Sequence, residues 1–160
     1  MGQVIQVSVS RGGIPKRAVT QARLTAQGVE SDSHLNLQYH GGPRQAVLWI
    51  TSEGNAELAA RGFPIESGTL GENITIVGVD RRDWRAGQRW RIGEALIELT
   101  KMRSPCKTLL PLGSGIHAAL YDAAVKAGDP SSPVWGLGGF YAAVVEPGLV
   151  RTRDEIRPAE

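Results

Sequence analysis

The chain has 160 residues, which suffices for one domain with a hydrophobic core. Hydrophobic residues make up 41% and charged residues 21%, and the formal net charge of +2 is too small to indicate a polyanionic partner. No apolar run approaches the roughly 20 residues of a membrane-spanning helix, and no signal peptide is recognisable. The single cysteine, Cys106, cannot form an internal disulfide. We therefore expect a cytoplasmic protein with one domain over residues 1–160 and no membrane association.

Most of the predicted elements are short β-strands bounded by glycine or proline. In chain order, alternating or β-branched runs predict strands at residues 4–10, 18–27, 46–50, 73–77 and 140–145. Residues 88–92 and 95–100 predict a hairpin that turns at Gly93 and Glu94. The last four residues, 157–160, predict a loose tail.

Two stretches predict helices. Residues 52–62 begin with Ser52 as a good N-cap and end with Gly62 at the expected C′ position. Residues 115–127 place apolar side chains on one face, and Gly128 ends that pattern. Many short strands, frequent glycine turns and only two helices favour a β-barrel or strongly bent sheet over a parallel α/β fold.

The glycine-rich segments match none of the common phosphate-binding or nucleophile motifs. Residues 136–139 read Gly-Leu-Gly-Gly and fit neither a Walker A loop nor a dinucleotide-binding turn. Residues 113–115, Gly-Ser-Gly, lack the spacing of a nucleophile elbow. The sequence therefore argues against a P-loop NTPase and against an α/β-hydrolase.

Two histidines, His34 and His40, lie on either side of a loop. Together with Cys106 they could bind zinc, although the spacing matches no compact zinc motif and no further ligand is evident. The other interpretations are hydrogen bonds to turn backbone, or a place in the lining of a polar pocket. His117 falls within the second predicted helix, where we expect a surface or packing role.

A basic and aromatic segment at residues 81–91 contains five arginines and two tryptophans. Such a mixture can bind nucleic acid through phosphate contacts and stacking. It is also typical of a solvated turn whose arginine side chains cover aromatic rings. The 16 acidic residues of the chain and the lack of a basic tail favour the solvated turn.

Cys106 has the neighbours of a functional thiol. It lies just past the end of a predicted strand and directly after Pro105, which stiffens the approach. Arg103 and Lys107 place positive charge nearby, which favours the thiolate form. The alternative is a small buried hydrophobic side chain, a common role for a free cysteine.

Eight segments of the chain form a set whose order and spacing are specific, although each alone is weak. They are Gly12-Gly13-Ile14-Pro15-Lys16, Gly28-Val29-Glu30-Ser31-Asp32-Ser33-His34, His40-Gly41-Gly42-Pro43, Gly68-Thr69-Leu70-Gly71-Glu72-Asn73, Arg85-Ala86-Gly87-Gln88, Arg103-Ser104-Pro105-Cys106, Gly138-Gly139-Phe140-Tyr141-Ala142 and Glu146-Pro147-Gly148-Leu149-Val150. Over about residues 12–156 the chain resembles the MOSC domain, named for the C-terminal domain of molybdenum cofactor sulfurases, and is most similar to small standalone bacterial members. The resemblance implies a mainly β fold, a strongly bent closed barrel with a few short helices.

The resemblance also implies a binding site for the molybdenum cofactor (molybdopterin). In related reductases of N-hydroxylated compounds a cysteine at the matching position ligates the metal, and here that residue is Cys106. A phosphate-bearing cofactor needs cations, backbone donors and one soft ligand. The other candidates for cofactor binding are Arg103, Asn73, His40, His34, Lys107, Lys101, Arg44 and Lys16.

Several functions are compatible with this resemblance. The first is an enzyme, a molybdenum-dependent reductase of N-hydroxylated bases or related compounds. The second is a sulfurtransferase or sulfur carrier in which Cys106 holds a persulfide for the cofactor. The third is a non-catalytic module that binds the cofactor or another anion, and nucleic-acid binding through residues 81–91 is the least favoured.

The sequence contains neither a desulfurase domain nor the companion β-barrel domain of the reductases. We therefore expect a cysteine desulfurase or a redox partner protein to supply sulfur or electrons to a small-molecule substrate or cofactor. Pyridoxal phosphate, which is associated with the family as a whole, is expected only through a partner.

Overall fold

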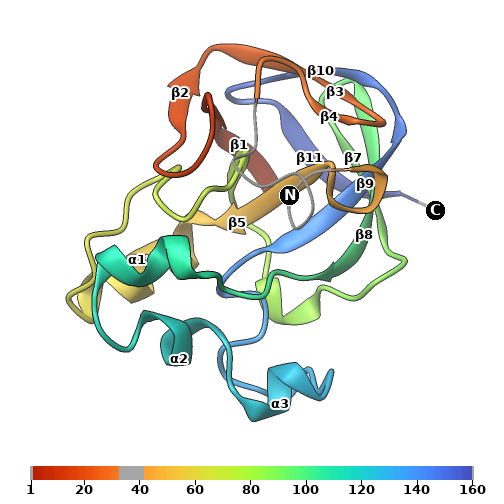
Figure 1. The fold of residues 1–160 in the computed structure, drawn as a ribbon. Helices are drawn as coiled ribbons and strands as arrows, with labels where there is room; N and C mark the ends of the chain where they lie inside the picture. Colours follow the sequence, from red (N-terminus) through yellow and green to blue (C-terminus); the bar gives the residue numbers. More distant parts are fainter. Residues whose placement is uncertain (1, 33–41, 160) are drawn as a thin grey trace.

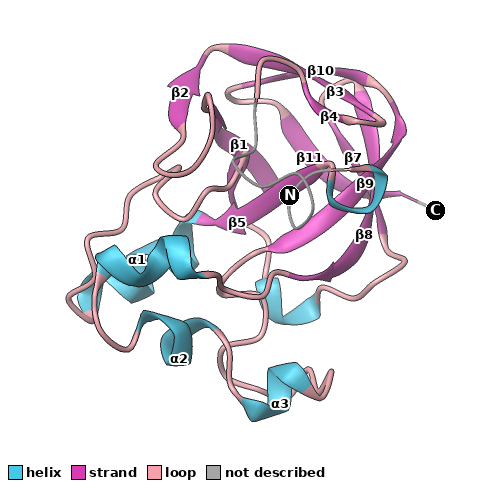
Figure 2. Cartoon of the chain, viewed as in Figure 1, coloured by secondary structure: helices cyan, strands magenta, loops and turns pink. Residues whose placement is uncertain are grey.

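A computed structural model describes residues 2–32 and 42–159 and shows a β-barrel with its α-helices gathered at one end (Figure 1). Figure 2 shows α1, α2 and α3 together below the strands, although the helices alternate with strands along the chain. The strands are β1 (Gly2–Val9), β2 (Arg17–Val19), β3 (Gln21–Thr25), β4 (Gly28–Val29), β5 (Val47–Thr51), β6 (Ile74–Val77), β7 (Arg89–Ile92), β8 (Ala95–Met102), β9 (Phe140–Glu146), β10 (Gly148–Arg151) and β11 (Glu155–Ala159). The helices are η1 (Pro43–Gln45), α1 (Ser52–Ala60), η2 (Arg81–Asp83), η3 (Lys107–Leu112), α2 (Ile116–Leu120) and α3 (Ala123–Lys126), where η marks a 3₁₀-helix.

Seven of the described strands close into a barrel in the order β11-β7-β8-β9-β5-β6-β1, because β1 also pairs with β11. The neighbours are antiparallel except β5 and β6, which run parallel and are joined by the crossover helix α1. A smaller sheet of β10, β3 and β4 accompanies the barrel. The predicted closed, mainly β fold is confirmed.

The prediction of a loose C-terminal tail is wrong for residues 157–159. Arg157, Pro158 and Ala159 pair in register with residues of β7, while the start of β11 pairs with β1. Buried Ile156 anchors the strand in the core. Hydrophobic alternation could not predict this strand, because a segment of three residues that includes a proline shows no alternation. Both strands that pair with it lie far away in the chain. Glu160 lies outside the described residues.

Two further predictions need correction. The predicted strand at 18–27 is interrupted, since β2 pairs with β1 in the barrel and β3 pairs with β10 in the smaller sheet. The predicted helix at 115–127 is two short helices, because the chain becomes extended at Tyr121 and Asp122 then caps α3 by accepting a hydrogen bond from the Val125 N–H.

The helix at 52–60 is confirmed, although its N-cap is Thr51 and not Ser52. The Thr51 hydroxyl accepts a hydrogen bond from the backbone N–H of Gly54. Gly62 follows the helix in the left-handed region, as the sequence predicts. Among the described helices, none combines the length and the apolar content needed to cross a membrane.

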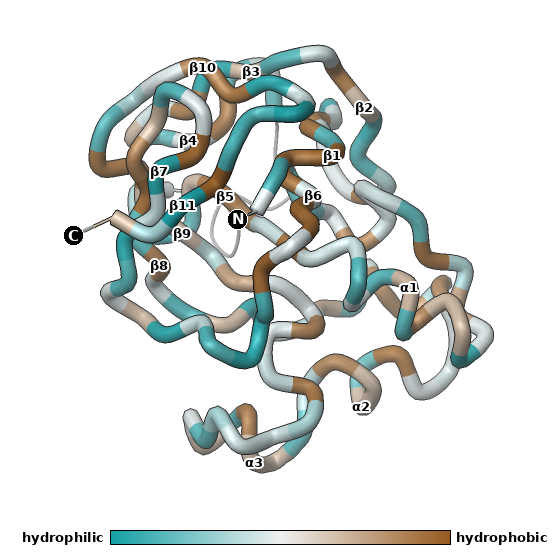
Figure 3. The backbone as a smooth tube through the Cα atoms, turned by 180° about the vertical axis from the view of Figure 1, so that it is seen from behind, coloured by the Kyte–Doolittle hydropathy of each residue, from teal (hydrophilic) through white to brown (hydrophobic). Residues whose placement is uncertain are grey.

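Aromatic side chains hold the barrel wall together. Trp49 of β5 is fully buried and stacks on Trp84 at 5.1 Å between ring centroids, while Trp90 of β7 meets Trp49 edge-on at 5.5 Å. Phe140 of β9 contacts Trp84 in the same way at 6.1 Å. Figure 3 shows hydrophobic stretches along β1, β5 and β6, which supply further side chains to this core.

A buried carboxyl group lies where the 68–73 loop meets α1. One oxygen of Glu72 accepts hydrogen bonds from the Asn55 amide and the Thr75 hydroxyl, both at 3.1 Å. Its other oxygen and the Asn55 carbonyl oxygen are buried without a partner. Burial raises the pKa of Glu72 above its ordinary value.

The Glu72→Gln variant is expected to remove a pH-dependent part of the stability. Because the folded pKa is raised, the folded state holds a proton that the unfolded state has lost, so stability is lost as pH rises above the ordinary carboxyl pKa. One group contributes a slope of at most about 1.4 kcal/mol per pH unit. Urea unfolding of wild type, Glu72→Gln and the exposed control Glu66→Gln from pH 4.5 to 8 measures this. Parallel stability curves for wild type and Glu72→Gln would contradict a protonated Glu72.

Candidate functional site

Cys106 lies where the chain leaves β8 and enters η3. It occupies the N-cap position of η3 in extended backbone conformation. The segment before it is tied to the barrel because the Arg103 N–H donates to the Gly139 carbonyl oxygen at 3.0 Å. Nε2 of His117 lies 2.8 Å from the carbonyl oxygen of Cys106 and joins α2 to this turn. Two elements therefore hold the backbone of Cys106 in place.

The thiol of Cys106 is partly exposed and surrounded by groups that favour its ionised form. Its sulfur lies 2.7 Å from the Thr108 hydroxyl oxygen. Burial by itself raises the pKa of the thiol, but hydrogen bonds from the Thr108 hydroxyl and backbone and the charge of Arg103 lower it by more. The pKa of Cys106 therefore lies below its ordinary value, which makes the thiol a better nucleophile and metal ligand.

Arg103 is a buried cation without a carboxylate partner. Its side chain is 3% exposed, and none of the described Asp or Glu residues forms an ion pair with it. Nη1 makes a long hydrogen bond of 3.4 Å to the Gly138 carbonyl oxygen, and Nε is buried without a partner. A buried charge of this kind is costly unless an anion compensates it. The thiolate of Cys106 and a bound anion are the two species that can do so.

A cleft opens beside the thiol. Cys106, Lys101 and Lys107 line it together with Tyr141 of β9 and residues of α3. The two lysines are exposed, whereas Tyr141 is 9% exposed. The structure therefore brings three of the predicted site residues to one surface. Arg103 does not line the cleft, but its charge acts on Cys106 from the interior.

Lys16 and Asn73 lie in a buried cluster around Asp32. The Lys16 ammonium forms an ion pair with Oδ2 of Asp32, and the Asn73 amide donates to the same oxygen at 2.8 Å. Oδ1 of Asp32 accepts from the Ser10 N–H at 2.9 Å. The Asn73 side chain also accepts from the Leu48 N–H at 3.1 Å, so it ties β5 to β1 and the 28–32 segment. Lys16 and Asn73 thus form a polar interior support.

The loop at residues 68–73 connects this cluster with Arg103. A Cβ atom at Gly71 would lie 3.0 Å from the Ile14 side chain and 3.9 Å from Nη2 of Arg103. A Cβ atom at Gly68 would lie 2.3 Å from the Lys16 carbonyl oxygen, and both glycines have positive φ. Both positions favour glycine because of their positive φ, and at Gly68 a side chain would also overlap the backbone of Lys16.

Among the remaining candidates, the structure places only Arg44. Arg44 of η1 is exposed, and its guanidinium is 3.9 Å from Glu98 rather than in the cleft. His34 and His40 lie outside the described residues. The described part of the chain contains no cluster of three or more His, Cys, Asp or Glu side chains that could hold a metal ion.

Three residues with a place at this site had no predicted role there. Asp32 belongs to a quoted motif, but only the fold shows that it pairs with Lys16 and Asn73. Tyr141 reads as an ordinary strand residue, and His117 as a helix surface residue, until β9 and α2 are seen beside Cys106. Only Asp32 could have been suspected from the sequence, because it is a carboxylate within a polar segment that also contains glycine.

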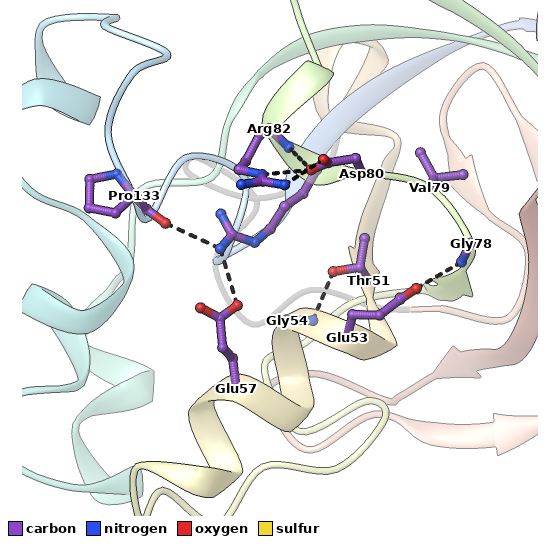
Figure 4. A pocket seen from close by; sticks show the side chains of 10 residues that line it. Thr51, Glu53, Gly54, Glu57, Gly78, Val79, Asp80, Arg82 and Pro133 are labelled. Atoms are coloured by element: carbon purple, nitrogen blue, oxygen red, sulfur yellow. Dashed lines mark hydrogen bonds and ion pairs between the residues drawn. The ribbon is translucent and has the colours of Figure 1, made fainter.

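A second pocket, beside α1, consists of charged groups that neutralise one another (Figure 4). Arg81 pairs with Glu57 and also donates to the carbonyl oxygens of Pro133 and Trp135. Hydrogen bonds and charge from Arg82 hold the pKa of Asp80 at about 2. The pocket therefore has little unpaired charge to offer a ligand.

The other arginines of the 81–91 segment are similarly engaged. Arg89 pairs with Glu98 and Arg91 with Glu146, while Arg85 donates to backbone carbonyl oxygens. Both tryptophans of the segment pack against the core. These contacts are those of a structured turn and give no support to nucleic-acid binding.

Comparison with known proteins assigns the chain to a family. A model of the MOSC domain matches residues 36–157. The chain belongs to the MOSC domain family. The matched region contains the Cys106 turn, Arg103 and Tyr141, whereas Lys16 and Asp32 precede it.

Relatives support the same assignment. The chain is 29% identical over 142 residues to the uncharacterized protein YflK of Bacillus subtilis, covering 86% of this chain and 59% of that one. It is 34% identical over 91 residues to the protein YiiM of Escherichia coli, covering 54% and 40%. The chain thus spans about half the length of the curated relatives that it matches.

A solved structure of a MOSC relative shares the fold. The crystal structure of YiiM from Geobacillus stearothermophilus superimposes with a TM-score of 0.71 at 23% identity and covers all of this chain and 76% of that one. At this identity the likeness establishes the fold alone.

Proposed function

We propose that this MOSC protein binds the molybdenum cofactor with Cys106 as the metal ligand, and that it serves the reduction of N-hydroxylated bases or related compounds. The single observation that carries the proposal is the partly exposed Cys106 thiol, of lowered pKa, beside the buried Arg103, which has no carboxylate partner among the described residues. A soft anionic ligand next to an unpaired cation suits an anionic thiolate-bound metal complex.

The residues present fit such a cofactor. The unpaired Nε of Arg103 and the exposed ammonium group of Lys101 supply positive charge around Cys106. The glycine backbone at Gly71 approaches Arg103 closely, as a site for a bulky anion needs. Lys16 and Asn73 support this loop from behind, since Asp32 and backbone groups already use their polar atoms.

When bound, the cofactor would supply two-electron redox chemistry. Reduction of an N-hydroxylated amine consumes two electrons and two protons and yields the amine and water. The electrons come from a redox partner protein in this proposal. The chain's own residues bind and orient the cofactor through Cys106 and Arg103, and they offer a substrate cleft on the outer side of the thiol.

A second candidate is a persulfide carrier. The observation that favours it is that the Cys106 sulfur faces an open cleft, where a partner's sulfur donor can reach it. A cysteine desulfurase, itself dependent on pyridoxal phosphate, would transfer a sulfur atom to the thiolate, and the resulting persulfide would pass it to the cofactor. The low pKa of the thiol serves this role equally well.

The Cys106→Ser variant is expected to lose bound molybdenum. Wild type, Cys106→Ser and the exposed control Ser114→Ala are purified from a host that makes molybdopterin, and metal and pterin are measured in each. We expect metal and pterin in wild type and the control, and a loss of at least tenfold in Cys106→Ser, because oxygen replaces the only thiolate that the chain can supply. Metal retained after Cys106→Ser contradicts ligation by this thiol, and an absence of metal and pterin from all three contradicts cofactor binding.

The same samples separate the two candidates. A reductase is expected to turn over 6-hydroxylaminopurine with an artificial electron donor. A carrier is expected to fail in that assay but to hold cyanolysable sulfur after incubation with a cysteine desulfurase, and to lose it in Cys106→Ser.

A further inference from the structure

The cleft beside Cys106 is large and has one sign of charge. It encloses about 1330 Å³, more than the 300–1,000 Å³ typical of a small-molecule site. The described residues that line it include the basic side chains Arg85, Lys101, Lys107 and Lys126 and no Asp or Glu. The whole chain is nearly balanced, with 18 basic and 16 acidic residues, so this imbalance is local. Residues 33–41 also contain no Asp or Glu that could neutralise it.

Two of these cations are available to a ligand. Lys107 at the start of η3 and Lys126 at the end of α3 are exposed, and neither forms an ion pair with a described residue. Arg85 is fixed differently, since its guanidinium lies 5.7 Å from the centre of the Trp135 ring and donates to two carbonyl oxygens. The cleft thus has one cation held by protein contacts and two exposed cations without an ion-pair partner among the described residues, which together attract an anion.

The floor of the cleft is aromatic. Trp135, Phe140 and Tyr141 line it from one side and Tyr121 from another. Three of these rings are largely buried, and Arg85 lies over the Trp135 ring, so such a floor offers edge contacts to a flat, apolar ring system. The ligand that matches both features carries a negative group at one end and a planar body at the other.

Tyr141 adds a polar contact within this floor. It is 9% exposed and lines the cleft, yet no hydrogen bond joins its hydroxyl to a described residue. A tyrosine hydroxyl can donate a hydrogen bond. In this cleft the Tyr141 hydroxyl has no acceptor among the described residues and is therefore available to an acceptor atom of a ligand.

We infer that the cleft binds the phosphate-bearing form of an N-hydroxylated aromatic base, a nucleotide, in preference to the neutral free base or nucleoside. Lys107 and Lys126 hold the phosphate at the rim, the aromatic floor holds the base, and the Tyr141 hydroxyl donates to it near the Cys106 sulfur. The inference rests on the proposed function and specifies its substrate class.

Equilibrium binding tests this without turnover. Three probes are used: adenosine 5′-monophosphate, adenosine and inorganic phosphate. Adenosine 5′-monophosphate corresponds to the reduced product. The proteins are wild type, Lys107→Glu/Lys126→Glu, and Arg17→Glu/Arg23→Glu, a control with the same charge change at exposed positions outside the cleft. Affinities are measured by calorimetry at low and high salt on full-length protein from a molybdopterin-producing host.

We expect wild type to bind the nucleotide on the order of tenfold more tightly than adenosine or phosphate, with the difference reduced at high salt. The Lys107→Glu/Lys126→Glu variant should lose this preference and keep its affinity for adenosine, and the control should behave as wild type. Equal affinity of wild type for nucleotide and nucleoside, or an unchanged nucleotide affinity in the cleft variant, overturns the inference. Phosphate binding as tight as nucleotide binding overturns the role of the aromatic floor.

Metal and pterin content of the same samples keeps the two proposals apart. Charge-dependent nucleotide binding by protein without cofactor supports the cleft and contradicts the proposed function. Protein that carries cofactor but shows no preference for the nucleotide supports the proposed function and overturns the cleft inference.

Discussion

Replacing Asp32 by alanine is expected to lower the free energy of unfolding by about 3–5 kcal/mol, the cost of leaving a buried charge without its partner. Lys16 is 8% exposed, and the side chain of Asp32 is 1% exposed. Removal of the carboxylate also leaves the Ser10 N–H without its acceptor and takes the shorter of two hydrogen bonds from the Asn73 amide, which keeps its bond to the Ser8 carbonyl oxygen. The substitution therefore weakens contacts in the three segments that contain Ser10, Lys16 and Asn73.

Urea unfolding measures this prediction, with the exposed Asp83→Ala as the matched control, which should change the stability by at most about 0.5 kcal/mol. The double variant Lys16→Met/Asp32→Leu removes both charges and should recover most of the lost stability, because no uncompensated charge stays buried. A loss below about 1 kcal/mol for Asp32→Ala would show that Lys16 reaches water or another acceptor.

Replacing Arg103 by methionine is expected to slow alkylation of Cys106 at pH 7 by on the order of tenfold, because thiolate falls tenfold for each unit by which the thiol pKa rises. Arg103 is one of the groups that lower the pKa of Cys106, and methionine fills similar space without charge. Since Cys106 is the only cysteine, labelling with iodoacetamide from pH 5.5 to 9.5 reports this thiol alone.

Two variants sharpen that experiment. Arg103→Lys keeps a positive charge and should stay closer to wild type than Arg103→Met, which separates charge from packing. Thr108→Val removes the hydroxyl at 2.7 Å from the sulfur and should also raise the thiol pKa. If Arg103→Met has the wild-type pH profile and remains folded by circular dichroism, the charge of Arg103 does not act on the thiol.

The barrel strands were predictable where hydrophobic alternation is local. Residues 73–77 and 140–145 fall on β6 and β9, and the hairpin around Gly93 is β7 and β8. The end of the chain was not predictable, because β11 is defined by pairing with β1 and β7 and not by its own pattern. The break between α2 and α3 was missed for a related reason, since the 115–127 segment keeps an apolar period across Tyr121 and Asp122.

The residues of the candidate site also differ in how far the sequence could predict them. Cys106 and Arg103 could be selected from local chemistry, a thiol beside fixed positive charge. Arg44 matched the same reasoning but lies beside Glu98, because η1 turns its side chain away from the cleft. Tyr141 could not be selected, since its place beside Cys106 depends on the pairing of β9 with β8.

By itself, the sequence determined the mainly β class, the family and the thiol of interest, because these depend on residue pattern and on motif order along the chain. The tertiary structure alone decided that Arg103 is buried without a carboxylate, that Lys16 is neutralised by Asp32, and that the cleft is cationic over an aromatic floor. Burial and ion pairing depend on which segments the closed barrel brings together. The spacing of residues along the chain therefore does not predict which charged side chains form ion pairs.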